Sequence, residues 1–477
     1  MFLLKRFIIG VVFVVVGWSP RNSCCAWDSK SPNFFQDLKA EADRKAEDTC
    51  FCQLEGAIDD CACQIGTVDK FNNLKIYPRL QSLLSKDYFR YFQVNLKKPC
   101  PFWTDDGACG LESCQVKACT EDEIPIGLKG QNRKISTTKT ERKCSEDLGS
   151  INETISEESQ ADFERWKSHD ENLVDFCTVK DDIDPDAQYV DLLLNPERFT
   201  GYVGPSAHRI WGSIYNENCF KQSFATSVME PFNKSNETCI EKRAFYRAIS
   251  GLHASINIHL SAKYLLDRSQ ANSFLSTTSD GKWGHNVTEF RNKFDKPEAH
   301  KKGFSWLKNL YFLYLLELKA VIRAAPFLRN FNFYTGNEEE DADMKLAVAD
   351  LLRTIDGFPS HFNESALFNN KDGPKLKADF HARFTNITKI MDCVGCQKCR
   401  LWGTIQVKGL GTALKILFSD PSAFRRGPEF LSRPEIVALL NGFGRLSNSI
   451  FELENFRRLM DLENSNTNTG WMPVGSG

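Results

Sequence analysis

Cysteine placement constrains the fold of this chain more than any other feature. Its 477 residues contain 17 cysteines, three of them in the run Cys393-Val-Gly-Cys396-Gln-Lys-Cys399. On a helix, residues three apart share a face, so Cys396 and Cys399 can meet and exchange oxidation state. The run therefore predicts redox chemistry. A ferredoxin-type iron–sulfur loop is disfavoured, because Gly403 stands where a fourth ligand belongs and no Cys-Pro follows.

The first residues have the pattern of a secretory signal peptide, which we assign to residues 1–26. Lys5 and Arg6 precede an apolar run, Phe7 to Trp18, and small and polar residues follow it. The run has roughly 12 residues, whereas a membrane-spanning helix needs about 20. An exported chain folds in an oxidising compartment, where its cysteines form disulfides more often than metal sites.

Six Asn-x-Ser/Thr sequons agree with export, because such sites carry glycans on the surface of lumenal proteins. They lie at Asn152, Asn233, Asn236, Asn286, Asn363 and Asn386. Composition excludes one class of function. With 42% hydrophobic residues, 12% aromatic residues and a formal net charge of −2, the chain has the composition of a globular protein without a basic patch for nucleic acid.

Two short Cys-x-Cys pairs bracket a polar turn near the start of the exported chain. Antiparallel pairing of the two ribs would form the disulfides Cys50–Cys63 and Cys52–Cys61. The four thiols could instead bind zinc, but Cys-x-Cys spacing suits zinc less well than two to four intervening residues. A chain of this length buries enough apolar surface without staples. Cysteines beyond structural need are therefore candidates for function.

A second cysteine set, Cys100, Cys109, Cys114, Cys119 and Cys144, precedes or lies within a polar stretch of little periodicity. That stretch, residues 104–159, predicts a long mobile loop. The pair Cys109 and Cys114 could form a small, accessible disulfide that a thiolate can attack, whereas buried bridges resist exchange. A purely structural staple in the loop is the equal alternative.

Apolar residues recur at helical spacing through most of the remaining chain. The recurrence predicts helices over residues 242–266, 307–324, 344–354 and 434–460, and helical pieces around Pro78 within residues 70–94. Pro434 suits a first helical turn after Ser432 as the N-cap. These patterns predict a mainly helical single domain over residues 27–463, followed by a disordered polar tail over residues 464–477.

A thiol catalyst must pass electrons onward, and the GxGxxG dinucleotide fingerprint is absent. Gly409-Leu-Gly411-Thr-Ala-Leu414 begins like one but has Leu in place of the third Gly. Other residues suit a nucleotide: arginine binds pyrophosphate, tryptophan stacks on a base, and serine or histidine donates to phosphate or ribose. The candidates are Arg198, Thr200, Trp211, Ser250 and His253.

Six motifs, taken together, resemble the endoplasmic reticulum oxidoreductins, which are FAD-dependent thiol oxidases that reoxidise protein disulfide isomerase. The resemblance extends from about Thr49 to Leu459. The motifs are Cys50-Phe-Cys-Gln, Asp87-Tyr-Phe-Arg-Tyr91, Pro99-Cys-Pro-Phe-Trp103, Asn195-Pro-Glu-Arg-Phe-Thr-Gly-Tyr202, Phe245-Tyr-Arg-Ala-Ile-Ser-Gly-Leu-His-Ala-Ser-Ile-Asn257 and Met391-Asp-Cys-Val-Gly-Cys-Gln-Lys-Cys-Arg-Leu-Trp-Gly403.

The resemblance implies a mainly α single domain whose central helix bundle cradles FAD, and it implies a thiol relay. Cys396 and Cys399 form the inner pair, with Cys399 nearest the flavin. Cys109 and Cys114 form the outer shuttle, which takes electrons from protein disulfide isomerase and passes them inward. Dioxygen reoxidises FAD and becomes hydrogen peroxide.

Further disulfides follow from the same resemblance. It implies structural bridges Cys100–Cys393 and Cys219–Cys239, and an inactive arrangement of the outer cysteines with Cys109–Cys144 and Cys114–Cys119. An outer cysteine held in the inactive arrangement cannot act as a carrier until it is reduced, so activity would follow the reducing load. Cys177 has no obvious partner.

The flavin contacts implied are Arg198, Thr200, Trp211, Ser250 and His253. Where family members place arginines on the cofactor phosphates, this chain has Lys293 and Trp306, with Arg291 nearby. Lysine contacts phosphate as a point charge and lacks the bidentate fork of arginine. We therefore expect Lys293 to bind the phosphates in a different way.

The expected location is the lumen of the endoplasmic reticulum, with peripheral association at the lumenal membrane face as a further option. The chain ends without a KDEL-type signal, which suggests retention through partner proteins. Three alternatives stay open: a non-catalytic, disulfide-stapled lumenal glycoprotein, a zinc or iron–sulfur protein, and a disulfide isomerase without flavin. The last is disfavoured because the CxxC lacks a thioredoxin-like βαβ context.

Overall fold

The structure is a computed structural model, and its helices dominate. It describes residues 74–100, 114–129, 184–197, 207, 210–211, 213–214, 235–263, 265–266, 283–294, 297–357, 373–419 and 430–468. Four long helices form the centre: α8 (Ser235–Lys263), α10 (Pro297–Asn330), α14 (Gln397–Phe418) and α15 (Arg433–Asn468). The mainly α fold expected from helical periodicity is confirmed.

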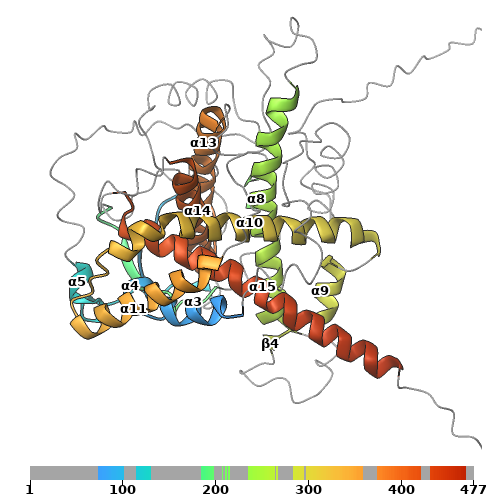
Figure 1. The fold of residues 1–477 in the computed structure, drawn as a ribbon, viewed down its shortest axis with the longest axis horizontal. Coiled ribbons are helices and arrows are strands. Elements are labelled where there is room, and N and C mark those ends of the chain that lie inside the picture. The colour runs from blue at the N-terminus through green and yellow to red at the C-terminus, as the bar shows by residue number, and fades with distance from the viewer. Residues whose placement is uncertain are drawn as a thin grey trace, which may run out of the picture.

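The central helices cross rather than run side by side as a simple bundle. In Figure 1, α8 and the pair α13 (Gly373–Met391) and α14 run in roughly the same direction, while α10 and α15 cross them. Helix α10 packs on α8, and α15 packs on both α14 and α8. Their buried residues are chiefly Leu, Ile, Val and Ala, so the hydrophobic effect holds this part of the molecule together.

A close approach of α14 and α15 explains Gly409, one of the two glycines that resemble a nucleotide fingerprint. A Cβ on Gly409 would lie 2.5 Å from the carbonyl oxygen of Ala438, so only glycine fits this contact. Gly409 and Gly411 both lie in the middle of α14, not in a loop before a helix. The role of Gly409 is helix packing, as expected for a sequence without a true GxGxxG motif.

The first described elements are α3 (Ile76–Leu84), α4 (Asp87–Arg90) and β1 (Tyr91–Val94). The helical prediction fails at β1, which pairs antiparallel with β2 (Gln188–Asp191). The cause is tertiary, because β1 finds a partner strand that lies far along the chain. Short aromatic and β-branched runs suit a half-buried strand as well as they suit a helix.

Residues 114–129 correct the prediction of a long mobile loop, because this part of residues 104–159 is packed. It contains η2 (Glu121–Glu123) and α5 (Ile126–Lys129), and Leu128 is fully buried. The Gly127 N–H donates to the carbonyl of Thr335, 2.8 Å away. This polar segment is held mainly by hydrogen bonds. A search for hydrophobic periodicity does not detect packing of this kind.

The remaining elements cover the bundle. They are β3 (Leu265–Leu266), β4 (Trp283–Gly284), α9 (Val287–Phe294), α11 (Glu338–Thr354) and η5 (Ile355–Gly357). Helix α15 begins after Ser432, whose N–H donates to Oε2 of Glu435 at 2.8 Å, and it runs to Asn468. The predicted disordered tail therefore begins too early, at residue 464. Within the described ranges, no helix is both long and apolar enough to cross a bilayer.

Candidate active site

The two inner cysteines lie at the N-terminus of α14. Cys396 is the N-cap, and its Sγ accepts a hydrogen bond from the Cys399 N–H at 3.4 Å. The two Sγ atoms are 2.7 Å apart, as a pair of close thiols, and each side chain is only 2% exposed. A helix N-terminus carries partial positive charge, which favours the thiolate needed for disulfide exchange.

The third cysteine of the CxxCxxC run does not share a helix with the other two, which corrects the helical interpretation of the whole run. Cys393 lies in the turn between α13 and α14 and forms a disulfide with Cys100, the pairing that the resemblance implies. A sulfur held in a disulfide cannot ligate a metal. This rules out an iron–sulfur site built on the three thiols of the run.

Arg400 fixes the turn that carries this disulfide. Its Nη2 donates to the carbonyl of Lys98 and to Oδ1 of Asp392, each at 2.8 Å. The guanidinium is largely buried, so these charge-assisted bonds form away from bulk water. They join the chain before Cys100 to the first turn of α14 and hold the inner cysteines at a defined place.

Cys114 reaches the inner pair from a distant part of the sequence. Its side chain is 1% exposed and packs in one small cluster with Cys396 and Cys399. Cys114 is disulfide-bonded, and its partner lies outside the described residues. Three sulfurs predicted as two separate redox pairs thus meet in one contact, although 282 positions separate Cys114 from Cys396 (396 − 114).

The structure keeps Cys119 apart from this sulfur cluster. It is a half-buried thiol whose backbone N–H donates to the carbonyl of Tyr189 at 2.8 Å. Burial first, and then the carboxylates of Asp191 and Glu123, raise the pKa of the thiol to about 11. The Cys114–Cys119 disulfide of the inactive arrangement is not formed here.

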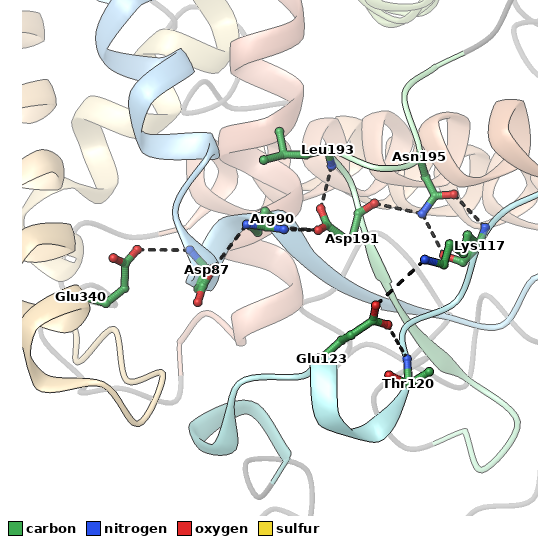
Figure 2. A network of polar contacts seen from close by, with 9 residues as sticks. All are labelled: Asp87, Arg90, Lys117, Thr120, Glu123, Asp191, Leu193, Asn195 and Glu340. Atoms are coloured by element: carbon green, nitrogen blue, oxygen red, sulfur yellow. Dashed lines mark hydrogen bonds and ion pairs between the residues drawn. The ribbon is translucent and has the colours of Figure 1, made fainter.

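We call residues 114–123 the strap, and Figure 2 shows the polar network that holds it. Arg90 binds the carboxylate of Asp191 on β2, with Nε 3.1 Å from Oδ2. Glu123 accepts the backbone N–H of Thr120 at 2.8 Å, which lowers the pKa of Glu123 and closes the turn after Cys119. Ala118 also forms an antiparallel bridge with Val190. The strap is therefore joined to β2 at one bridge and to its surroundings by side-chain hydrogen bonds.

An apolar pocket opens against one of the two inner sulfurs, that of Cys399. The pocket is partly open to solvent. Its walls are mostly aliphatic side chains of α8, α13 and α14, with Trp211, Gly403 and Gln406 among them. Such a lining, with few polar groups, is typical of small-molecule and cofactor sites.

Two of the predicted flavin residues meet beside this pocket. Trp211 lines it, and the indole stacks on the imidazole of His253 with centroids 4.0 Å apart and planes at 17°. Ser250, one turn before His253 on α8, is fully buried and accepts a hydrogen bond from Nδ2 of Asn309 at 3.0 Å. The structure thus places Trp211 and His253 beside the pocket that Cys399 lines, whereas the Ser250 hydroxyl faces Asn309 of α10.

Lys293 approaches the same surface of α8 from α9. Its Nζ donates to Oδ1 of Asn257 at 2.9 Å, and Nδ2 of Asn257 donates to the carbonyl of His253 at 3.0 Å. The side chain also pairs with Glu289 at 3.3 Å. Through Asn257, Lys293 is therefore linked to the turn of α8 that carries His253.

Arg198 and Thr200 lie outside the described residues, but the chain just before them is anchored. The carboxylate of Glu197 is buried, 2.7 Å from Nε of Arg445 and 3.2 Å from Nε2 of His259. Nε2 of Gln406 donates to Oε1 of Glu197 at 3.3 Å. This charge network ties residue 197 to α8, α14 and α15 and sets the starting point of the segment.

The roles of four polar residues near the site were not predicted from the sequence. Asn195, Glu197, Gln397 and Gln406 are polar residues without a motif of their own, and their partners are backbone groups or distant side chains. The one available signal was their place inside the quoted motifs or, for Gln406, just after one of them. Pairing across hundreds of residues left no local pattern.

Many predicted positions lie outside the described residues. They include Cys50, Cys52, Cys61, Cys63, Cys109, Cys144, Cys177 and Cys219, and the sequons at Asn152, Asn233 and Asn363; for Cys239 and Asn236 only the backbone of α8 is described. Of the other sequons, Asn386 is half-buried on α13. Asn286 departs from the expected surface position, because it is 8% exposed and its Oδ1 accepts the Glu289 N–H at 2.8 Å.

Comparisons with known proteins agree with this geometry. Residues 75–453 match the family model Endoplasmic Reticulum Oxidoreductin 1 (ERO1). The chain belongs to this oxidoreductin family. Its bovine relative "ERO1-like protein alpha" is 50% identical over 442 residues, covering 87% of this chain and 93% of the relative. The Drosophila melanogaster "Ero1-like protein" is 49% identical, covering 90% and 94%.

Solved oxidoreductin structures share the fold. The structure of a double cysteine-to-alanine mutant of S. cerevisiae Ero1p superposes with a TM-score of 0.56 at 29% identity, covering 86% of this chain and all of that chain, or 100%. A second structure describes Ero1p as a source of disulfide bonds for oxidative protein folding, with a TM-score of 0.55 at 29% identity and the same coverage of 86% and 100%. Membership in this family makes the chain an oxidoreductase of oxidative protein folding.

Proposed function

We propose that this oxidoreductin is an FAD-dependent thiol oxidase that reoxidises protein disulfide isomerase and passes the electrons to dioxygen. One observation carries the proposal. The outer cysteine Cys114, the inner pair, and a pocket that suits a flat apolar ligand form one continuous series from the strap to the bundle core. A non-catalytic glycoprotein would have no need to bury three sulfurs from two redox pairs in one contact.

The residues present fit a flavin. The pocket is lined mostly by apolar side chains, as ligand sites are, and Cys399 is part of its wall. Among the described residues, the buried Oε1 of Gln406 has no hydrogen-bond partner although it lies at this pocket. An isoalloxazine ring offers an N–H donor, so the cofactor would satisfy this acceptor. Such satisfaction matters because an orphaned buried acceptor costs about 1–3 kcal/mol.

Trp211, His253 and Ser250 would hold the cofactor, and Lys293 would contact its phosphates. When bound, FAD supplies a two-electron acceptor that dioxygen reoxidises, with hydrogen peroxide as the product. The chain's own residues perform the thiol steps. A thiolate of protein disulfide isomerase attacks the outer disulfide of Cys109 and Cys114, and its second thiol resolves the mixed disulfide. The reduced outer pair then reduces a disulfide between Cys396 and Cys399.

The burial of the inner pair supports this division of labour. At 2% exposure, Cys396 and Cys399 are closed to a folded protein substrate, whereas a carrier on the strap can reach them. The partner is therefore a protein dithiol that meets the outer pair. We place the enzyme in the lumen of the endoplasmic reticulum because of the signal-peptide pattern and the sequons.

The decisive measurement is the visible absorption spectrum of the purified chain, together with oxygen uptake in the presence of reduced protein disulfide isomerase. We expect a flavin band and oxygen uptake in the wild type. In Cys396→Ala the band should persist while the uptake falls to background, because the inner disulfide cannot form. A folded but colourless wild-type protein would overturn the oxidase proposal and favour the stapled glycoprotein.

A further inference from the structure

Asn195 binds the strap as a neighbouring strand would. Its side chain is fully buried, with Oδ1 accepting the Lys117 N–H at 2.8 Å and Nδ2 donating to the Lys117 carbonyl at 2.9 Å. Nδ2 also donates to the carbonyl of Asp191 at 2.9 Å. One side chain thus satisfies both backbone groups of a residue three positions after Cys114. Figure 2 shows the side chain of Asn195 facing the backbone of Lys117.

The same residue is joined to the helix that carries the inner pair. The backbone carbonyl of Asn195 accepts a hydrogen bond from Nε1 of Trp402, on α14, at 2.7 Å. A second tie lies one residue closer to Cys114. The Val116 N–H donates to Oε1 of Gln397 at 3.0 Å, and Gln397 stands between Cys396 and Cys399 in sequence. Two consecutive strap residues are therefore clamped to the inner site.

The hydrogen bonds of Asn195 to Lys117 and of Gln397 to Val116, which we call the clamp, determine which strap sulfur faces the inner pair. Cys114 packs on Cys396 and Cys399, whereas Cys119 is bonded to β2 through the carbonyl of Tyr189. A disulfide needs Cα atoms within about 7 Å, and the structure holds Cys114 and Cys119 on different partners. A Cys114–Cys119 disulfide therefore requires the strap to bend, and bending removes Val116 and Lys117 from their partners.

We propose that Asn195 is a positioning residue that selects between transfer and inhibition. By holding Lys117, it keeps Cys114 against the inner pair and keeps Cys119 on β2, away from Cys114. The inference rests on the proposed thiol relay. Other residues of the network in Figure 2 hold β2 and the turn after Cys119, but Asn195 alone among them binds both backbone groups of Lys117 within the described residues.

The transfer of two electrons from the outer thiols to the inner disulfide needs no added oxidant. The Cys114 thiolate attacks the inner disulfide, so an S–S bond forms between Cys114 and one inner sulfur and the other inner sulfur leaves as a thiolate. The second outer thiol, Cys109 in our assignment, gives up its proton and attacks Cys114. The outer disulfide closes, the second inner sulfur leaves, and two electrons have moved inward. This sequence needs Cys114 at the inner pair, which is what the clamp provides.

The test compares Asn195→Ala with Asn441→Ala in the full-length chain. Asn441 is an apt control, because it is also a buried asparagine whose Nδ2 donates to two backbone carbonyls, those of Phe89 at 3.2 Å and Val437 at 2.9 Å, but neither carbonyl belongs to the strap. Each variant is equilibrated in the same glutathione buffer, quenched by alkylation, and its Cys114 disulfides are mapped by mass spectrometry. Oxygen uptake is measured over a range of reduced protein disulfide isomerase concentrations.

In Asn195→Ala we expect kcat to fall about tenfold, since misplacing a reacting group carries costs of this order or more. KM for the isomerase should change little, and the share of Cys114 joined to Cys119 should rise several-fold. Asn441→Ala should keep the wild-type disulfide distribution, even when its free energy of unfolding is lowered as much as that of Asn195→Ala. Equal disulfide distributions in the two variants would overturn the inference, even if both lose activity.

Two further variants cover the case in which Asn195→Ala does not fold. Asn195→Asp retains the acceptor for the Lys117 N–H but loses the donor bonds, and Gln397→Ala removes only the clamp on Val116. Both should shift the disulfide map in the same direction by a smaller factor, and an unchanged map in both would overturn the inference. A wild type without flavin or oxygen uptake would refute the thiol oxidase instead, and the disulfide map would still report on the clamp.

Discussion

The bundle core and the strap are held by different kinds of interaction. The core of α8, α10, α14 and α15 buries long apolar faces and a few fully enclosed charges. The strap over residues 114–123 is held by hydrogen bonds to backbone groups, a single bridge to β2 and one buried cysteine. Apolar burial resists any displacement, whereas a few hydrogen bonds can be exchanged for water at little net cost. The apolar pocket thus lies in the rigid part, and Cys114 lies in the exchangeable part.

The largest effect should follow from removing the buried charge of Glu197. Its carboxylate faces Arg445 at 2.7 Å, with both side chains almost fully enclosed. In Glu197→Ala the guanidinium stays buried without its counter-charge, so we expect the free energy of unfolding to fall by about 3–5 kcal/mol. Thermal and denaturant unfolding measure this loss.

Glu454→Ala is the matched control, because its partner Arg458 lies four residues away on the exposed face of α15. That change should cost no more than about 0.5 kcal/mol. Similar losses in the two variants would show that the core does not depend on its enclosed charges.

A smaller loss is expected from Gly409→Ala. The new Cβ would lie 2.5 Å from the carbonyl oxygen of Ala438, so α14 and α15 would have to separate. Overpacking of this kind costs about 1–3 kcal/mol. Chemical denaturation would detect it. An unchanged midpoint would mean that the two helices can move apart freely and that the core is less rigid than the strap.

Gln406→Leu tests the pocket without opening the core. It removes the buried Oε1 that lies at the pocket and has no partner within the described residues. We expect flavin affinity to fall about tenfold, as the loss of one hydrogen bond of about 1.4 kcal/mol would give. The unfolding midpoint of the flavin-free protein should also fall, because Nε2 of Gln406 no longer donates to the buried carboxylate of Glu197. Flavin titration by fluorescence measures the first quantity. Unchanged affinity would place the flavin N–H against some other acceptor.

The smallest effect concerns the thiol of Cys119. Its pKa is raised from 9.0 to about 11, first by burial and then by Asp191 and Glu123. Stability from the protonated thiol is therefore complete below about pH 9 and is lost as the pH rises through about 11. At pH 8, alkylation of Cys119 should be about a hundredfold slower than that of an exposed thiol, because the thiolate reacts.

Graded variants sharpen this prediction. Asp191→Asn should speed alkylation of Cys119 by several-fold, and Glu123→Gln should speed it less, in the order of their influence on the pKa. The rate is followed by mass spectrometry between pH 7 and pH 10. A pH profile that stays the same in Asp191→Asn would assign the low reactivity to burial alone.

Sequence reasoning located the helices of the core well and the strap poorly. Regular apolar spacing marked α10, α11 and α15, because each helix has a face that must be buried. The strap gave no such pattern, and it was taken for a mobile loop. Its packing depends on Asn195 and Gln397, which meet it from residues 78 and 281 positions away along the chain.

The sequence alone determined the redox chemistry, the mainly helical class and the family, since cysteine spacing and helical periodicity are local properties of the chain. The resemblance had also implied the Cys100–Cys393 bridge, which the structure confirms. Tertiary structure decided that Cys114 meets Cys396 and Cys399 in one contact and that Gln397 holds the strap at Val116. Those contacts join segments hundreds of residues apart. Such contacts arise only when the whole core has closed, because the cost of bringing distant segments together is met by burial across the entire domain.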